Sequence, residues 1–145
     1  MNLKGSRILV PIDGSEPSLR ALDAAAQLAR SMGQRLDVVT VLDLAQVDVF
    51  EGFYMNDEQM RRLMERTQTE VLEKVPGRLG PDAPPFASRL LHGKALKVLL
   101  EEASQPGVSL VVVGRTGKGM FERMLEGSIS RGLVVHATVP ILVVA

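Results

Sequence analysis

Short apolar runs alternate with amphipathic stretches along this chain. Five runs rich in Val, Ile and Leu have the length and β-branched character of buried strands. Between them, apolar residues recur three and four positions apart, which is typical of helices that bury one face. The alternation predicts an α/β fold, with a parallel sheet and helices on both of its faces. The expected strands are residues 7–12, 36–42, 86–92, 108–113 and 140–144.

Capping signals bound the first two expected helices. Ser15 stands before Pro17 as an N-cap, and Gly33 follows the apolar stripe as a C-terminal stop. Asn56 and Gln59 have the spacing of a capping box. They open a helix whose inward side we expect to comprise Met60, Leu63, Met64, Thr67, Val71 and Val75.

Proline and glycine divide the second half of the chain. Four of the eight prolines lie in the segment from Pro76 to Pro85, which we expect to be a surface loop and not a domain boundary. Gly93 leads into a helix that stops at Gln105, and the last helix is expected from Ser128 to His136.

Length and charge narrow the classes of function. A chain of 145 residues can bury one core, so residues 1–145 are expected to form a single domain. Lysine and arginine total 17, as do aspartate and glutamate, which argues against nucleic acid as a partner. The chain has no cysteine, no apolar stretch of membrane-spanning length and no signal-peptide core. We therefore expect a cytoplasmic protein that binds neither nucleic acid nor a membrane.

A glycine-rich segment follows the fourth expected strand. Gly114 and Gly117 allow the backbone to approach a ligand closely, and Gly127 with Ser128 stands where a helix begins. Free amides at a helix start suit a polyphosphate, although the same residues also fit an ordinary connection that ends in a serine cap. Neither the Walker pattern nor the dinucleotide fingerprint is present in this segment.

The ends of the other strands also indicate a ligand site near the glycine-rich segment. Asp13, residues 41–43 and residues 92–93 follow or end three of the expected strands. In an open parallel sheet, ligands bind beyond the carboxyl ends of the strands, near the point where the strand order reverses. The convergence therefore supports a ligand site more strongly than the glycine spacing does.

Three segments resemble the universal stress protein family. Residues 8–18, Ile-Leu-Val-Pro-Ile-Asp-Gly-Ser-Glu-Pro-Ser, are similar to its first strand and turn, and residues 136–144 to its last helix and strand. Residues 114–128 fit its pattern Gly-x-x-Gly, nine residues, Gly-Ser, which marks the branch that binds ATP. The resemblance covers the whole chain. It implies a Rossmann-like, five-stranded parallel sheet of order 3-2-1-4-5, and a homodimer that pairs through the strand Pro140–Ala145.

The resemblance implies roles for the matching residues of the first strands. Pro11 and Ile12 would flank the adenine base, and the backbone of Val41 would read its edge. Asp13 would contact the ribose or help to hold magnesium at the phosphates, against the alternative that it caps the next helix. Gly114 would meet the ribose.

The phosphates would be bound at the glycine-rich segment. Amides of Gly117, Gly127 and Ser128 would donate to them, with Ile129 continuing the helix start. Lys118 would supply a mobile cation, although a solvated loop charge is an equally good interpretation. The ligands implied by the resemblance are therefore ATP and magnesium.

No catalytic residue is expected. His92 and His136 lie on different elements and are interpreted as structural, and no nucleophile has an identifiable base beside it. We expect an ATP-binding stress-response regulator that hydrolyses ATP slowly or not at all and acts on an unidentified protein partner. A nucleotide-free dimeric interaction module and a weak ATPase are the alternatives, and the preference among ATP, AMP and cyclic AMP stays open.

One aromatic cluster has no role in that scheme. Phe50, Phe53 and Tyr54 are three of the five aromatic residues of the chain. A lid over the nucleotide, an apolar patch for a partner and packing on the sheet are all consistent with their position.

Overall fold

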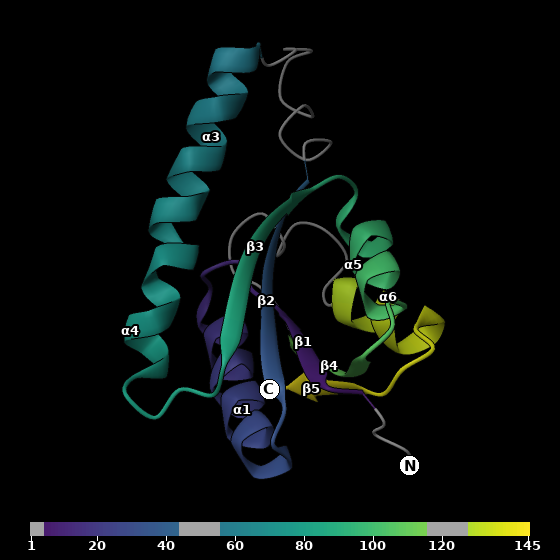
Figure 1. The fold of residues 1–145 in the computed structure, drawn as a ribbon. Helices are drawn as coiled ribbons and strands as arrows, with labels where there is room; N and C mark the ends of the chain where they lie inside the picture. The colour runs from purple at the N-terminus through teal and green to yellow at the C-terminus, as the bar shows by residue number, and fades with distance from the viewer. Residues whose placement is uncertain (1–4, 44–55, 116–127) are drawn as a thin grey trace.

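A five-stranded sheet forms the centre of the computed structural model, which describes residues 5–43, 56–115 and 128–145. Every strand pairing is parallel and the order is β3-β2-β1-β4-β5 (Figure 1). The fold class and the strand order expected from the sequence are therefore confirmed. The strands are β1 (Arg7–Pro11), β2 (Arg35–Leu42), β3 (Phe86–His92), β4 (Val108–Gly114) and β5 (Ile141–Val144).

Helices cover both faces of this sheet (Figure 1). One side carries α1 (Glu16–Met32), α3 (Asp57–Glu70), the 3-10 turn η1 (Leu72–Lys74) and α4 (Val75–Leu79). The other side carries α5 (Ala95–Ala103) and α6 (Ser128–His136). None of the helices within the described ranges has the length and apolar character needed to traverse a bilayer.

Two apolar layers fix the helices to the sheet. Ile8 and Val10 of β1 pack with the residues of α1, whereas Leu9 packs with those of α5 and α6. Val38 and Val39 of β2 divide between the two layers in the same way. Successive residues of a strand point to opposite faces, so a strand covered on both faces must be apolar throughout. This is why the central strands are continuous apolar runs in the sequence.

The caps of two helices follow the sequence prediction. The Ser15 hydroxyl accepts the amide of Ser18 at 3.4 Å, and Gly33 ends α1 with a φ of 65°. Asn56 and Gln59 form the complete capping box, with side chain to amide distances of 2.8 Å and 3.0 Å.

The expected inward face is right only at its carboxyl end, where Val71 packs against the core and Val75 is buried, and it is wrong for the residues within α3. This helix buries none of its residues: Met60 and Leu63 are only partly covered, and Met64 is 36% exposed. The contact with the sheet is made by the segment after α3, where Leu72 and Val75 are buried. The apolar periodicity could not show this, because the chain leaves the axis of α3 through a 3-10 turn before it reaches the core.

The prediction of a surface loop over residues 76–85 is wrong for the first part of that segment. Pro76 lies inside α4 instead of in a loop. Proline suits the first turn of a helix, since its φ is already near the helical value and the missing amide has no intrahelical acceptor there. Gly80 follows this short helix and adopts a positive φ of 75°.

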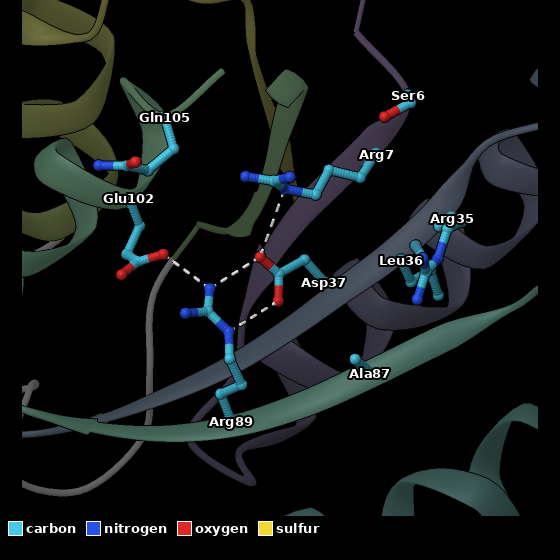
Figure 2. Close-up of a pocket in the computed structure, with 9 residues that line it drawn as sticks. All are labelled: Ser6, Arg7, Arg35, Leu36, Asp37, Ala87, Arg89, Glu102 and Gln105. Carbon is cyan, nitrogen blue, oxygen red and sulfur yellow. Dashed lines mark hydrogen bonds and ion pairs between the residues drawn. The ribbon is translucent and has the colours of Figure 1, made fainter. Parts of the chain in front are cut away.

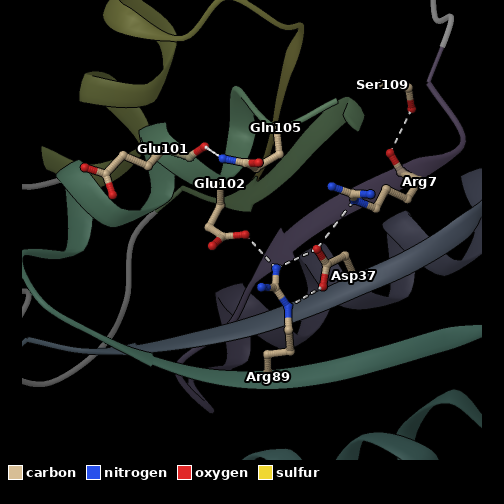
Figure 3. A network of polar contacts seen from close by, with 7 residues as sticks. All are labelled: Arg7, Asp37, Arg89, Glu101, Glu102, Gln105 and Ser109. Atoms are coloured by element: carbon tan, nitrogen blue, oxygen red, sulfur yellow. Dashed lines mark hydrogen bonds and ion pairs between the residues drawn. The ribbon is translucent and has the colours of Figure 1, made fainter. Parts of the chain in front are cut away.

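A charged network ties the amino-terminal ends of three strands to α5 (Figure 3). Arg89 on β3 donates to Asp37 on β2 through Nε at 3.2 Å and Nη2 at 2.8 Å, and Nη2 also lies 2.6 Å from Glu102 on α5. Arg7 on β1 lies 3.7 Å from the same aspartate. Hydrogen bonds to Glu102 and Asp37 raise the pKa of Arg89. Asp37 is only 7% exposed, so these partners offset the cost of burying its charge.

We expect Leu133→Ala to lower the free energy of unfolding by about 2–5 kcal/mol, because this fully buried side chain of α6 would leave a cavity. Denaturant unfolding measures the change. Met64→Ala, on the exposed α3, is the control and should alter stability by less than about 0.5 kcal/mol. Similar losses in the two variants would contradict the division between a packed α6 and an exposed α3.

Candidate functional site

The carboxyl edge of the sheet gathers the predicted residues of three strands. Pro11 ends β1, and Ile12 and Asp13 follow it. Val41 lies one residue before the end of β2, and Gly114 ends β4. Because β1 lies between β2 and β4, all five positions lie at the middle of one edge. The strand order also reverses at β1, which is where open parallel sheets bind ligands.

The end of β1 leaves part of β2 without a partner strand. The last register pair is Pro11 with Val39, and the Ile12 amide donates to the Val39 carbonyl at 2.8 Å. Residues two apart on a parallel strand direct their backbone groups to the same side. The amide and carbonyl of Val41 therefore point toward β1, beyond the place where β1 has ended. No residue in the described ranges pairs with them there, so a backbone donor and acceptor are presented side by side.

Asp13 forms the turn that leads into α1. Its Oδ1 accepts the amide of Ser15 at 2.9 Å, and its own amide donates to the Ser18 hydroxyl oxygen at 3.2 Å. Gly14, between Asp13 and Ser15, has a positive φ of 86°. The cap of α1 is thus Ser15, and Asp13 shapes the turn before it. The carboxylate remains exposed, and within the described residues its second oxygen accepts no hydrogen bond.

Gly114 is required by the protein's own packing. It pairs with Val144 in the sheet and its φ is not positive. A Cβ at this position would lie 2.7 Å from the carbonyl oxygen of Pro17 and 3.0 Å from the amide nitrogen of Ser18. The close approach is therefore to the first turn of α1, which sits directly against the end of β4.

The start of α6 lies beside the same strand end. The Ser130 hydroxyl donates to the Arg115 carbonyl at 3.2 Å, and the Arg115 amide donates to Val144 at 2.8 Å. Ser128 begins the helix, and Ile129 packs into the apolar layer beneath it. The N-termini of α1 and α6 thus flank the end of β4. At α1 the amides of Ser15 and Ser18 are already hydrogen-bonded and residue 17 is a proline, so what the two helix starts share is the positive end of the helix dipole, which favours an anion.

The sequence placed Asp43 at a strand end but did not reveal its role as a cap for α5. Its Oδ2 accepts the amide of Ala95, the first residue of α5, at 3.0 Å. The N-cap residue of that helix, Lys94, provides no capping side chain. A carboxylate therefore already occupies the start of α5 and offsets part of the positive end of its helix dipole. The two partners are 52 positions apart in the sequence, so no local pattern reveals this contact.

Some predicted residues cannot be placed. Six of them lie outside the described ranges, so their roles stay predictions: Gly117, Lys118, Gly127, Phe50, Phe53 and Tyr54.

Comparison with known proteins gives a match over nearly the whole chain. The model of the Universal stress protein family matches residues 5–145. The universal stress protein YxiE of Bacillus subtilis is 30% identical over 147 residues, covering 96% of this chain and 98% of its own.

Solved structures show the same fold. A universal stress protein in complex with cAMP is 22% identical, with a TM-score of 0.61, over 97% of this chain and 96% of its own. The universal stress protein from Archaeoglobus fulgidus in complex with dAMP is 18% identical, with a TM-score of 0.68, over 99% of this chain and 100% of its own.

Gly114→Ala should lower the free energy of unfolding by about 1–3 kcal/mol, because the new methyl group would meet backbone atoms that cannot move aside. Gly77→Ala in α4 is the matched control, since nothing lies within 4 Å of its Cβ position. Alanine there should stabilise the helix by about 0.5–1 kcal/mol. Thermal and denaturant unfolding compare the two variants. A Gly114→Ala protein as stable as the control would refute the packing of α1 on β4.

Proposed function

The chain belongs to the universal stress protein family, a family of stress-response proteins, and we propose that it is a member that binds adenine nucleotides, with ATP as its ligand. The observation that carries this proposal is the unpaired backbone edge of Val41 beyond the end of β1. Adenine offers a donor and an acceptor side by side, which match a backbone carbonyl and amide. Two solved relatives hold cAMP and dAMP, which are also adenine nucleotides.

The neighbouring groups fit the rest of the nucleotide. Asp13 is exposed beside the end of β1 and can accept from ribose hydroxyls or share a magnesium ion with the phosphates. The starts of α1 and α6 direct the positive ends of their helix dipoles toward the phosphates. The choice of ATP rests on the resemblance of Gly114, Gly117, Gly127 and Ser128 to the pattern of the family's ATP-binding branch.

Magnesium would enter with the nucleotide. No group of three or more His, Asp or Glu that could hold a metal is found in the part of the chain that the structure describes. Magnesium commonly keeps waters and binds one or two carboxylates together with substrate phosphates, so the single carboxylate of Asp13 is sufficient for a shared ion. When bound, the ion would neutralise phosphate charge.

We propose that binding, and not turnover, is the function, with at most a weak ATPase activity. The described residues of the site contribute backbone groups and one carboxylate, which hold charge and orient a ligand. Rapid hydrolysis would also require a group that positions or activates the attacking water. The bound nucleotide would then set the affinity for a protein partner in the cytoplasm.

We further propose a homodimer through the strand Pro140–Ala145. Among the strands that the structure describes, β5 pairs with β4 alone, and Leu142 and Val143 are each 38% exposed. The Val111 amide donates to the Pro140 carbonyl. The backbone amides and carbonyls of the even-numbered residues of this strand therefore point toward β4, and those of the odd-numbered residues point away from the sheet. Such an unpaired edge is a template for a second copy of the strand.

Asp13→Asn tests the nucleotide site. Asparagine keeps the oxygen that accepts the Ser15 amide but removes the charge. With magnesium present, we expect ATP affinity measured by calorimetry to fall about tenfold, since a charged contact contributes about 1.5–3 kcal/mol. Without magnesium the carboxylate repels the phosphates, so the substitution should leave ATP affinity unchanged or increase it.

Asp57→Asn is the control, because Asp57 is an exposed aspartate in the first turn of another helix. It should not alter ATP affinity. Calorimetric titrations with AMP and cyclic AMP rank these nucleotides against ATP by affinity. Folded protein that binds none of them at millimolar concentration would reject the proposal in favour of a nucleotide-free interaction module.

Val143→Pro tests the homodimer. Proline removes an amide that points outward and spares the hydrogen bonds to β4. We expect the variant to sediment as a monomer under conditions in which the unchanged protein is a dimer. Val143→Thr keeps both the amide and the branched shape and should remain dimeric. Dimerisation of the proline variant would exclude pairing through this edge.

A further inference from the structure

A pocket lies at the amino-terminal edge of the sheet, opposite the proposed nucleotide site (Figure 2). It has a volume of about 440 Å³ and lies between the starts of β1, β2 and β3 and the last turn of α5. Arg7 pairs with Arg35 in the register of β1 and β2, and Asp37 pairs with Ala87 in that of β2 and β3. Paired residues of parallel strands share a face, so all four side chains lie on the side of α5.

The pocket has more positive than negative charge. Arg7, Arg35 and Arg89 line it with Asp37 and Glu102, so three cations against two anions leave an excess of one positive charge. Arg89 holds both carboxylates. Exposed Arg35 forms no ion pair with any residue in the described ranges.

Arg7 has an unmet hydrogen bond. Its Nε is buried and finds no hydrogen-bond acceptor, and its nearest carboxylate oxygen, on Asp37, lies 3.7 Å away. A buried donor without an acceptor is costly, and this atom is out of reach of a ligand, so a bound group would meet the Nη groups of Arg7, whose side chain is partly exposed. Asp37 cannot approach further, because Arg89 holds both of its oxygens in a two-pronged contact.

We propose that this pocket binds a phosphate group, with Arg7 and Arg35 as its direct ligands and Arg89 as the residue that fixes the pocket wall. Guanidinium groups match the planar spacing of phosphate oxygens and stay charged at all working pH values. Ser6, at the rim of the pocket, adds a hydroxyl donor. The volume exceeds that of a bare ion and lies in the range of small-molecule sites, so the phosphate is carried by a small polar molecule.

The test follows backbone amide resonances of the full chain during titration with inorganic phosphate and, separately, with glycerol 3-phosphate. We expect saturable shifts at Arg7, Arg35 and Ala87, and tighter binding of the ester because it fills more of the pocket. Shifts confined to Asp13 and Val41 would place the phosphate at the proposed nucleotide site and overturn the proposal.

Substitutions of single arginines show whether phosphate binds in this pocket. Arg35→Gln removes an exposed side chain without an ion pair, so the fold should remain intact, and phosphate affinity should fall about fivefold. Arg7→Gln should reduce it further, provided that its amide spectrum shows a folded protein. Arg66→Gln on α3 removes the same charge far from the pocket and is the matched control. An equal loss in the control and Arg35→Gln, or no saturable shift with either ligand, would refute the site.

Phosphate binding at this pocket can be tested separately from nucleotide binding at the carboxyl edge. Asp13→Asn should leave the shifts at Arg7 and Arg35 unchanged, since Asp13 lies at the opposite edge of the sheet. Loss of ATP binding with retained phosphate shifts would therefore reject the nucleotide site alone, and the reverse pattern would reject this pocket alone.

Discussion

Parallel pairing of all five strands is the constraint from which both edges of this protein derive their chemistry. Each strand must be followed by a connection that returns to the opposite edge of the sheet, so α1, α5 and α6 all begin at the carboxyl edge. Their dipoles give that edge a positive potential. The chain uses the three starts differently. At α1 the Ser15 hydroxyl caps the helix and the Asp13 carboxylate accepts the Ser15 amide; at α5 the Asp43 carboxylate accepts the first amide; and the start of α6 is held against β4.

The same constraint places the negative helix ends at the amino-terminal edge. Helices α1 and α5 finish there, and the strand starts next to them are rich in arginine. Asp37 would be costly to bury alone, but Arg89 and Arg7 surround it and Glu102 fixes Arg89 in turn. The two edges are therefore electrostatically different sites on one sheet, separated only by the length of the strands.

A site made of backbone groups tolerates changes of sequence. The features at Val41 depend on where β1 stops pairing, and those at the starts of α1 and α6 on the direction of the helices. None of them requires a particular side chain. Such features can persist while side chains diverge, and the solved relatives share this fold at 18–22% identity.

The sequence by itself determined the strands and most of the helices, because strand and helix formation depend on local periodicity and on caps such as Ser15, Gly33 and Asn56. It did not show η1 or the short helix α4. Strand order followed from the family resemblance and not from periodicity. Tertiary structure alone decided that α3 stays outside the core, that Gly114 makes room for α1, and that Asp43 caps a helix 52 residues away. These outcomes depend on which surfaces meet in space, and no local pattern of residues records such distant contacts.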